Sequence, residues 1–128
     1  MTQTRVVIVD DHPVFRQGLR DVLETDPGLQ VVGEAANGEV AFQMAEDVQP
    51  EVMLIDINLP DIDGYEVARR LRASSKSELA TVPIIAVTAN ALKGDAEKAL
   101  EAGCDVYMSK PINIRELWAR VEAFVPSP

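Results

Sequence analysis

Apolar residues along the chain alternate between short continuous runs and longer stretches in which they recur at helical spacing. The short runs are rich in β-branched residues, as is typical of strands that are buried on both faces. We therefore expect five strands, at Val6–Val9, Leu29–Val32, Val52–Ile55, Ile84–Val87 and Val106–Met108.

Between these runs, apolar residues recur three and four positions apart, which is typical of the buried face of an amphipathic helix. The first such stretch runs from Phe15 to Leu23, and the last runs from Ile114 to Val125. The spacing predicts three more helices, over about 40–48, 65–71 and 95–102. The polar segment 73–81 is expected to be a loop.

Strands that alternate with helices indicate an α/β fold built from βαβ units around a parallel sheet. A length of 128 residues fits one domain. We predict a single-domain, doubly wound (βα)5 sandwich over residues 1–125, with 126–128 as a tail or the start of a linker.

Composition and charge exclude several classes of function. The chain has no apolar run long enough for a membrane span and no secretory signal at its N-terminus. Its single cysteine, Cys104, excludes an internal disulfide framework, so a reducing, cytoplasmic location is expected. A net charge of −9 argues against direct binding of nucleic acid, and the one dense basic group, at 69–72, is expected to be a solvated helix face.

Five polar residues stand where four of the predicted strands end. Ligands of open parallel sheets bind beyond the carboxyl ends of the strands, so these side chains are expected to converge. They are Asp10, Asp11, Asp56, Thr88 and Lys110.

This set of residue types indicates a particular chemistry. Three carboxylates about 5 Å apart repel by roughly 3 kcal/mol for each pair at an effective dielectric near 20, and a divalent cation would relieve that repulsion. Oxygen ligands in an open site favour Mg²⁺. A lysine and a threonine hydroxyl beside the cluster suit the binding of a phosphoryl group, so the set favours phosphoryl transfer to a carboxylate.

Four segments, VVIVDD, VMLIDINLPDIDG, PIIAVTA and YMSKP, resemble the motifs of response regulator receiver domains, the phosphoacceptor modules of two-component signalling. They occur in the order of that family and cover almost the whole chain. The resemblance implies a flavodoxin-like sheet with the strand order 2-1-3-4-5.

The same resemblance implies a role for each residue of the site. Asp56 would be the phosphoacceptor. Mg²⁺ (or Mn²⁺) would be bound by Asp56, directly by Asp11, by Asp10 through a water molecule, and by the backbone carbonyl of Asn58. Thr88 and Lys110 would contact the phosphoryl oxygens.

Two further implications concern the end of the last strand and the switch that phosphorylation operates. The peptide bond between Lys110 and Pro111 would be cis. Movement of Thr88 towards the phosphoryl group would let Tyr107 turn inwards. This would alter a protein-binding surface formed by the fourth expected helix (95–102), the fifth strand and the last helix.

The resemblance also implies the partners. A histidine kinase or a histidine phosphotransferase would supply the phosphoryl group, and a downstream protein would read the switched surface. The chain would be a stoichiometric phosphoacceptor rather than a turnover enzyme, and a single-domain regulator or a relay intermediate. Its first part resembles receivers attached to DNA-binding domains, and its later part resembles receivers of hybrid kinases and single-domain phosphorelay regulators.

Alternatives remain for individual residues and for the whole chain. Asp10 and Asp11 would also suit a helix N-cap before Pro13. His12 is interpreted as a surface or helix-start residue. Phe15 is either core or part of the surface that docks the histidine-bearing partner. The chain as a whole could also be a receiver-like binding module that is never phosphorylated, or a Mg²⁺-dependent phosphohydrolase of the haloacid dehalogenase type.

Overall fold

A single parallel sheet organises the protein, whose computed structural model describes residues 3–88, 95–110 and 112–123. The five strands are hydrogen-bonded in the order β2-β1-β3-β4-β5, which confirms the predicted topology. The strands are β1 (Thr4–Val9), β2 (Leu29–Ala35), β3 (Val52–Asp56), β4 (Ile84–Thr88) and β5 (Val106–Ser109).

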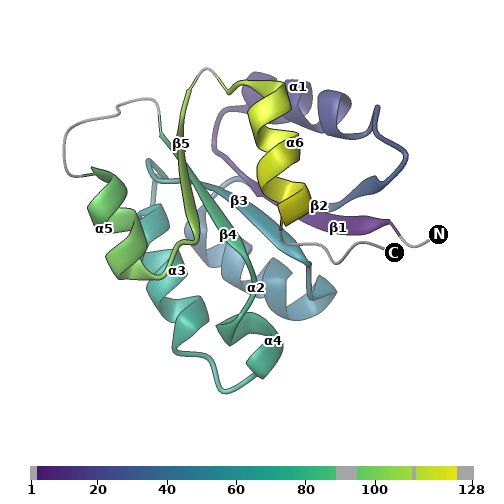
Figure 1. Ribbon diagram of the computed structural model, residues 1–128. Helices are drawn as coiled ribbons and strands as arrows, with labels where there is room; N and C mark the ends of the chain where they lie inside the picture. The colour runs from purple at the N-terminus through teal and green to yellow at the C-terminus, as the bar shows by residue number, and fades with distance from the viewer. Residues whose placement is uncertain (1–2, 89–94, 111, 124–128) are drawn as a thin grey trace.

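Helices cover both faces of this sheet, as Figure 1 shows. One face carries α1 (Pro13–Leu23) and α6 (Ile114–Ala123), and the other carries α2 (Gly38–Val48), α3 (Gly64–Arg72) and α5 (Asp95–Ala102). Each face has its own core. Val6, Ile8 and Leu54 pack towards α1 and α6, whereas Val7, Met53 and Ile55 pack towards α2, α3 and α5. Every residue of β3 is therefore buried, which explains why its sequence is a continuous apolar run up to Asp56.

The prediction of a plain loop over 73–81 was wrong, because this segment contains a single helical turn, α4 (Ser77–Ala80). Leu79 is buried in the core beside α3, and the Lys76 carbonyl accepts hydrogen bonds from the N–H groups of Leu79 (3.1 Å) and Ala80 (3.0 Å). A helical period needs at least two apolar residues to be visible in a sequence, and this turn has only one large one.

β2 is three residues longer than its apolar run predicts. Pairing with β1 continues through Val9 and Ala35, although Gly33 and Glu34 interrupt the hydrophobic pattern. Backbone hydrogen bonds to a central strand hold this edge segment whatever its side chains are.

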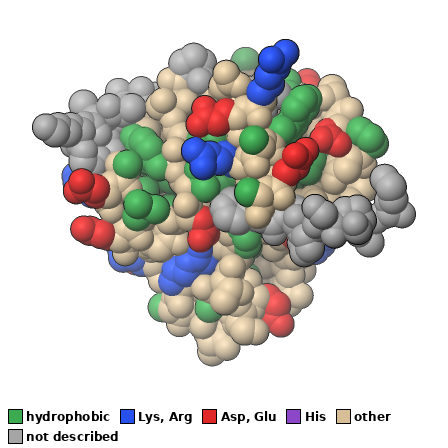
Figure 2. All heavy atoms as spheres, viewed as in Figure 1, with side chains coloured by type: hydrophobic (Ala, Val, Ile, Leu, Met, Phe, Trp, Pro, Cys, Tyr) green, Lys and Arg blue, Asp and Glu red, His purple; other side chains and the backbone are tan. Residues whose placement is uncertain are grey.

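The sheet order fixes where a ligand site belongs. β1 lies between β2 and β3, so the connections that leave β1 and β3 diverge and open a crevice at their carboxyl ends. The face in Figure 2 shows Lys and Arg side chains separated by acidic and apolar ones, without a continuous basic field among the residues described. No helix in the described ranges is long and apolar enough to cross a membrane.

Candidate functional site

Two buried carboxylates stand at the carboxyl ends of neighbouring strands. Asp10 directly follows β1 and Asp56 is the last residue of β3, and each is only 2% exposed. Oδ1 of Asp10 accepts a hydrogen bond from the N–H of His12 at 2.8 Å, and Oδ1 of Asp56 accepts one from the N–H of Asn58 at 3.0 Å. In each case the carboxylate accepts from the N–H two residues later, which fixes its direction and leaves its Oδ2 for other partners.

Lys110, which follows the edge strand β5, contacts both carboxylates. Its backbone N–H donates to the carbonyl of Thr88 at 2.7 Å. Its Nζ lies 3.0 Å from Oδ2 of Asp10 and 3.3 Å from Oδ2 of Asp56. Lys110 therefore forms one charged group with Asp10, which lies 100 positions earlier in the sequence, and with Asp56, which lies 54 positions earlier. The side chain of Lys110 is only 14% exposed.

Asp11 and His12 complete a set of possible metal ligands with these carboxylates. One atom from each of Asp10, Asp11, His12 and Asp56 lies within 4.8 Å of the others. Ligand atoms about 2.1 Å from one ion lie within such distances of one another. Oδ1 of Asp11 is buried and receives no hydrogen bond in the part of the chain that the structure describes. The donor set is dominated by carboxylate oxygens, so it fits Mg²⁺ or Mn²⁺.

Burial and charge act together on Asp56. Burial raises the pKa of its carboxyl above the ordinary value, and repulsion from Asp10 acts in the same direction. The N–H of Asn58 and the ammonium of Lys110 oppose this rise without cancelling it. An ionised Asp56 is therefore held at a cost, which a cation or a covalent modification would reduce.

Thr88 and Tyr107 lie on the same side of the sheet. Thr88 is the last residue of β4 and is buried, and Tyr107 on β5 pairs in register with Ala86, two residues before Thr88. Side chains two residues apart in a strand point to the same face. Tyr107 is half-buried against the core beneath α2, α3 and α5, so the two side chains are diagonal neighbours on that face.

The loop after β3 is held in place by close packing at Gly64 and by hydrogen bonds to the carboxylate of Asp61. A Cβ at Gly64 would lie 2.7 Å from the carbonyl oxygen of Asp56, so only glycine lets α3 begin this close to the strand. The carboxylate of Asp61 accepts hydrogen bonds from the N–H groups of Gly38 (2.8 Å) and Glu39 (3.0 Å) at the start of α2. Desolvation of Asp61 opposes its charge, but these N–H groups outweigh that effect and lower its pKa.

The structure brings Asp10, Asp11, Asp56 and Lys110 together as the sequence predicts. Asn58 lies in the adjoining loop and contacts Asp56 through its N–H. Its carbonyl as a metal ligand stays a prediction. The expected cis bond before Pro111 lies outside the described residues.

Three features of the site were missed or undervalued from the sequence. Nδ1 of His12 lies 3.2 Å from Oδ1 of both Asp10 and Asp11, so this residue belongs to the cluster although it also begins α1. Arg16 donates to the carbonyl of Asp10 at 2.6 Å and to Glu34 at 3.1 Å. The ring of Phe15 lies under Lys110. The position of His12 next to two aspartates was the one available signal.

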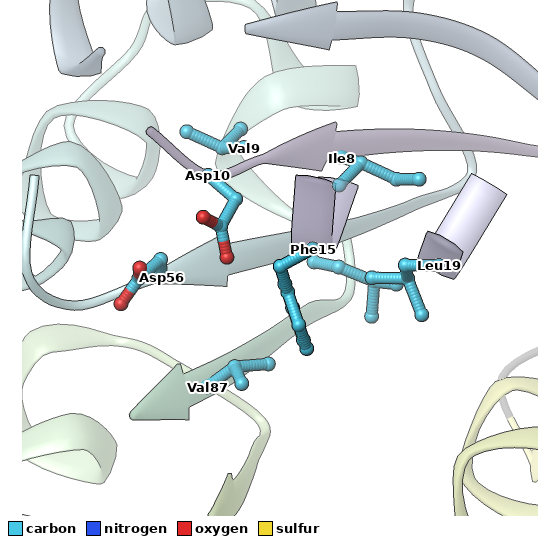
Figure 3. Close-up of a pocket in the computed structure, with 8 residues that line it drawn as sticks. Ile8, Val9, Asp10, Phe15, Leu19, Asp56 and Val87 are labelled. Atoms are coloured by element: carbon cyan, nitrogen blue, oxygen red, sulfur yellow. The ribbon is translucent and has the colours of Figure 1, made fainter. Parts of the chain in front are cut away.

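A shallow pocket lies directly beside the two buried carboxylates and is drawn in Figure 3. Asp10 and Asp56 contribute its polar wall, and Phe15 contributes an aromatic wall from α1. The remaining lining residues are aliphatic: Ile8, Val9, Leu19, Leu54 and Val87. Cys104 lies elsewhere, in the core, where burial raises the pKa of its thiol to about 11 and makes it unreactive.

Comparison with known proteins gives one consistent result. The sequence profile described as "Response regulator receiver domain" matches residues 6–122. The polar-differentiation response regulator DivK of Brucella anthropi is 35% identical over 120 residues, which are 94% of each chain.

Solved structures agree with this match. The receiver domain of the sensor histidine kinase PA1611 from Pseudomonas aeruginosa is 35% identical, with a TM-score of 0.86, over 98% of this chain and 100% of that one. That structure has a magnesium ion coordinated in its active site cleft. A LuxR-family response regulator from Aurantimonas sp. SI85-9A1 is 33% identical, with a TM-score of 0.86, over 95% of this chain and 84% of that one. The similar structures thus include a receiver domain from a sensor histidine kinase and a LuxR-family response regulator.

Proposed function

The chain belongs to the response regulator receiver domains of two-component signalling, and from that premise we propose that it takes up a phosphoryl group on Asp56. The observation that carries this assignment is the environment of Asp56. It is a buried carboxylate at a strand end, in contact with Lys110 and within reach of two further aspartates. We place the receiver domain at residues 1–125, around the matched range 6–122.

The proposed reaction is an in-line displacement at phosphorus. A carboxylate oxygen of Asp56 forms the new O–P bond while the P–N bond of a partner's phosphohistidine breaks, and the departing imidazole nitrogen keeps the electron pair and takes a proton from water. Lys110 starts 3.3 Å from Oδ2 of Asp56 and binds a phosphoryl oxygen after transfer. The hydroxyl of Thr88 is assigned to a second phosphoryl oxygen.

Asp10, Asp11 and Asp56, together with the carbonyl of Asn58, are proposed to hold Mg²⁺ or Mn²⁺. The bound cation would neutralise charge on the carboxylates and on the incoming phosphoryl group. Without it, the entering dianion would meet three carboxylates and a single ammonium. Transfer should therefore depend strictly on the cation.

The proposed output is a change of a protein-binding surface. Phosphorylation adds negative charge beside Thr88, and a shift of Thr88 towards it would open space for its diagonal neighbour Tyr107. Tyr107 lies on β5, between α5 and α6, so its rotation biases the surface that these three elements form. A downstream protein, rather than nucleic acid, would read that surface.

The proposed donor is a histidine kinase or a histidine phosphotransferase, and the cytoplasm is the proposed location of this chain. In this scheme the chain is a stoichiometric phosphoacceptor that acts as a single-domain regulator or as an intermediate in a relay. It catalyses its own phosphorylation and dephosphorylation and does not turn over a separate substrate.

Intact mass spectrometry tests the proposal. The chain is incubated with acetyl phosphate and Mg²⁺, beside Asp56→Asn and beside a sample with EDTA. One phosphoryl adduct is expected on the wild-type chain and none in either control. Multiple turnover of a phosphomonoester would instead indicate a phosphohydrolase. Absence of an adduct with acetyl phosphate and with a phosphorylated histidine phosphotransferase would overturn the assignment in favour of an unphosphorylated binding module.

A further inference from the structure

The ammonium of Lys110 has a third neighbour besides its two carboxylates. Nζ lies 4.1 Å from the centre of the Phe15 ring, over its face. An ammonium has three N–H donors, and within the described residues two of them are matched by Oδ2 of Asp10 and Oδ2 of Asp56. The aromatic face therefore stands where a third acceptor would be.

The surroundings strengthen this contact. Lys110 is only 14% exposed, and Phe15 and Leu19 extend from α1 along the wall of the pocket that Asp10 and Asp56 also line, as Figure 3 shows. The attraction between a cation and a ring face grows when both are shielded from water. Phe15 is half-buried against the core formed with Leu19, so the ring is anchored on one side and faces the charge on the other.

We infer that Phe15 is a positioning residue for Lys110. Its ring holds the ammonium over the crevice between the two carboxylates and shields it from solvent. This inference rests on the proposed function, in which Lys110 passes from Asp56 to a phosphoryl oxygen. A ring face attracts a cation across its whole width, so the contact persists while Nζ moves, whereas a third hydrogen bond would have to break.

The inference separates Phe15 from an ordinary core residue. Substituents that withdraw electron density from the face of the ring but keep its shape should weaken binding of a phosphoryl group. They should not weaken binding of the metal. The carboxylates that hold the metal are fixed by the N–H groups of His12 and Asn58 and do not depend on the ring. A residue that acted only by packing would show neither this selectivity nor any response to the ring's electrons.

The experiment uses the full chain and two readouts. The first is NMR without any phosphodonor. The ε-CH₂ protons of Lys110 should resonate upfield of those of the exposed Lys76, because they lie over a ring, and Phe15→Leu should abolish that difference. The second is the affinity for beryllofluoride, a mimic of the phosphoryl group, measured in saturating Mg²⁺ beside the affinity for Mg²⁺ alone.

Phe15→Leu is expected to weaken beryllofluoride binding about fivefold and to change Mg²⁺ binding less than about twofold. Phe15→Tyr keeps the ring and should bind both like the wild type. Trifluorophenylalanine introduced at position 15 keeps the shape but depletes the ring's electrons, and should match Phe15→Leu. Phe42→Leu is the matched control, because Phe42 is half-buried on the opposite face of the sheet.

Each other outcome overturns the inference. Unshifted Lys110 protons would show that the contact is not made in solution. A trifluorinated chain that binds beryllofluoride like the wild type would reduce Phe15 to packing, as would parallel losses of beryllofluoride and Mg²⁺ in Phe15→Leu. If the wild-type chain bound no beryllofluoride at all, the proposed function would fail, and the NMR shift would still decide whether the ring holds Lys110.

Discussion

Replacement of Asp56 by asparagine should make the metal-free protein more stable. The atoms of Asp10, Asp11 and Asp56 that face one another lie within 4.8 Å, so each neighbouring carboxylate repels Asp56 by at least about 3.5 kcal/mol at an effective dielectric near 20. Lys110, 3.3 Å away, attracts it by about 5 kcal/mol on the same scale. The net repulsion is about 2 kcal/mol on this scale. Burial, the main cause of the raised pKa of Asp56, disfavours the charged carboxylate in the same direction.

Asparagine removes this charge and keeps an oxygen for the N–H of Asn58. A stabilisation of about 2 kcal/mol corresponds to an increase in Tm of about 6–10 °C for a domain of this size. The assay is thermal unfolding followed by circular dichroism at pH 7 in EDTA. Asp47→Asn, which removes the same charge from an exposed position on α2, is the control and should leave Tm nearly unchanged.

The pH dependence has a definite sign. The pKa of Asp56 is higher in the folded chain than in the unfolded one, so the folded chain binds more protons and its stability falls as pH rises through this range. The advantage of Asp56→Asn should therefore be full at pH 7 and should shrink as pH falls below the raised pKa. An unchanged or lowered Tm at pH 7 in EDTA would refute the electrostatic reasoning.

Three other substitutions test the packing of Gly64 behind Asp56, the contacts of the Arg72 guanidinium and the set of metal ligands. Gly64→Ala should lower stability by about 1–3 kcal/mol and slow phosphorylation, because the new Cβ would press on the carbonyl of Asp56; normal unfolding and normal kinetics would contradict this. Arg72→Met should lower the free energy of unfolding in urea by about 2–4 kcal/mol, because this guanidinium donates to three backbone carbonyls and one carboxylate from separate segments. The control Arg69→Met, on the exposed face of α3, should have little effect on it. His12→Asn should reduce affinity for Zn²⁺ by tenfold or more and affinity for Mg²⁺ by less than about twofold in calorimetric titrations, since imidazole favours the softer ion; equal losses would exclude the ring as a ligand.

The sequence was sufficient to predict the sheet and the convergence of the acidic residues, for a physical reason. β1, β3 and β4 are buried on both faces, so their apolar runs are unbroken and their ends are marked by the first polar residue. Parallel strands place all those ends at one edge. Asp10, Asp56 and Thr88 could therefore be placed together before any contact was known, and Lys110 follows β5 at the same edge.

Contacts between side chains from different elements could not be predicted in this way. The ring of Phe15 reads as a core position on α1, and nothing in its local sequence shows that a lysine 95 residues later lies over it. Arg16 and Glu34 are 18 residues apart, and their contact depends on how α1 packs on β2. The α4 turn was missed because a single buried leucine produces no period.

The central claim is that Asp56 carries the phosphoryl group, and reductive trapping tests it most directly. Borohydride reduces an acyl phosphate to an alcohol, so a phosphorylated aspartate becomes homoserine and survives digestion. After treatment with a phosphodonor and Mg²⁺, peptide sequencing by mass spectrometry should find homoserine at position 56 and nowhere else, and none in EDTA. Homoserine at Asp10 or Asp11, or a phosphoryl adduct that leaves Asp56 unreduced, would contradict the account.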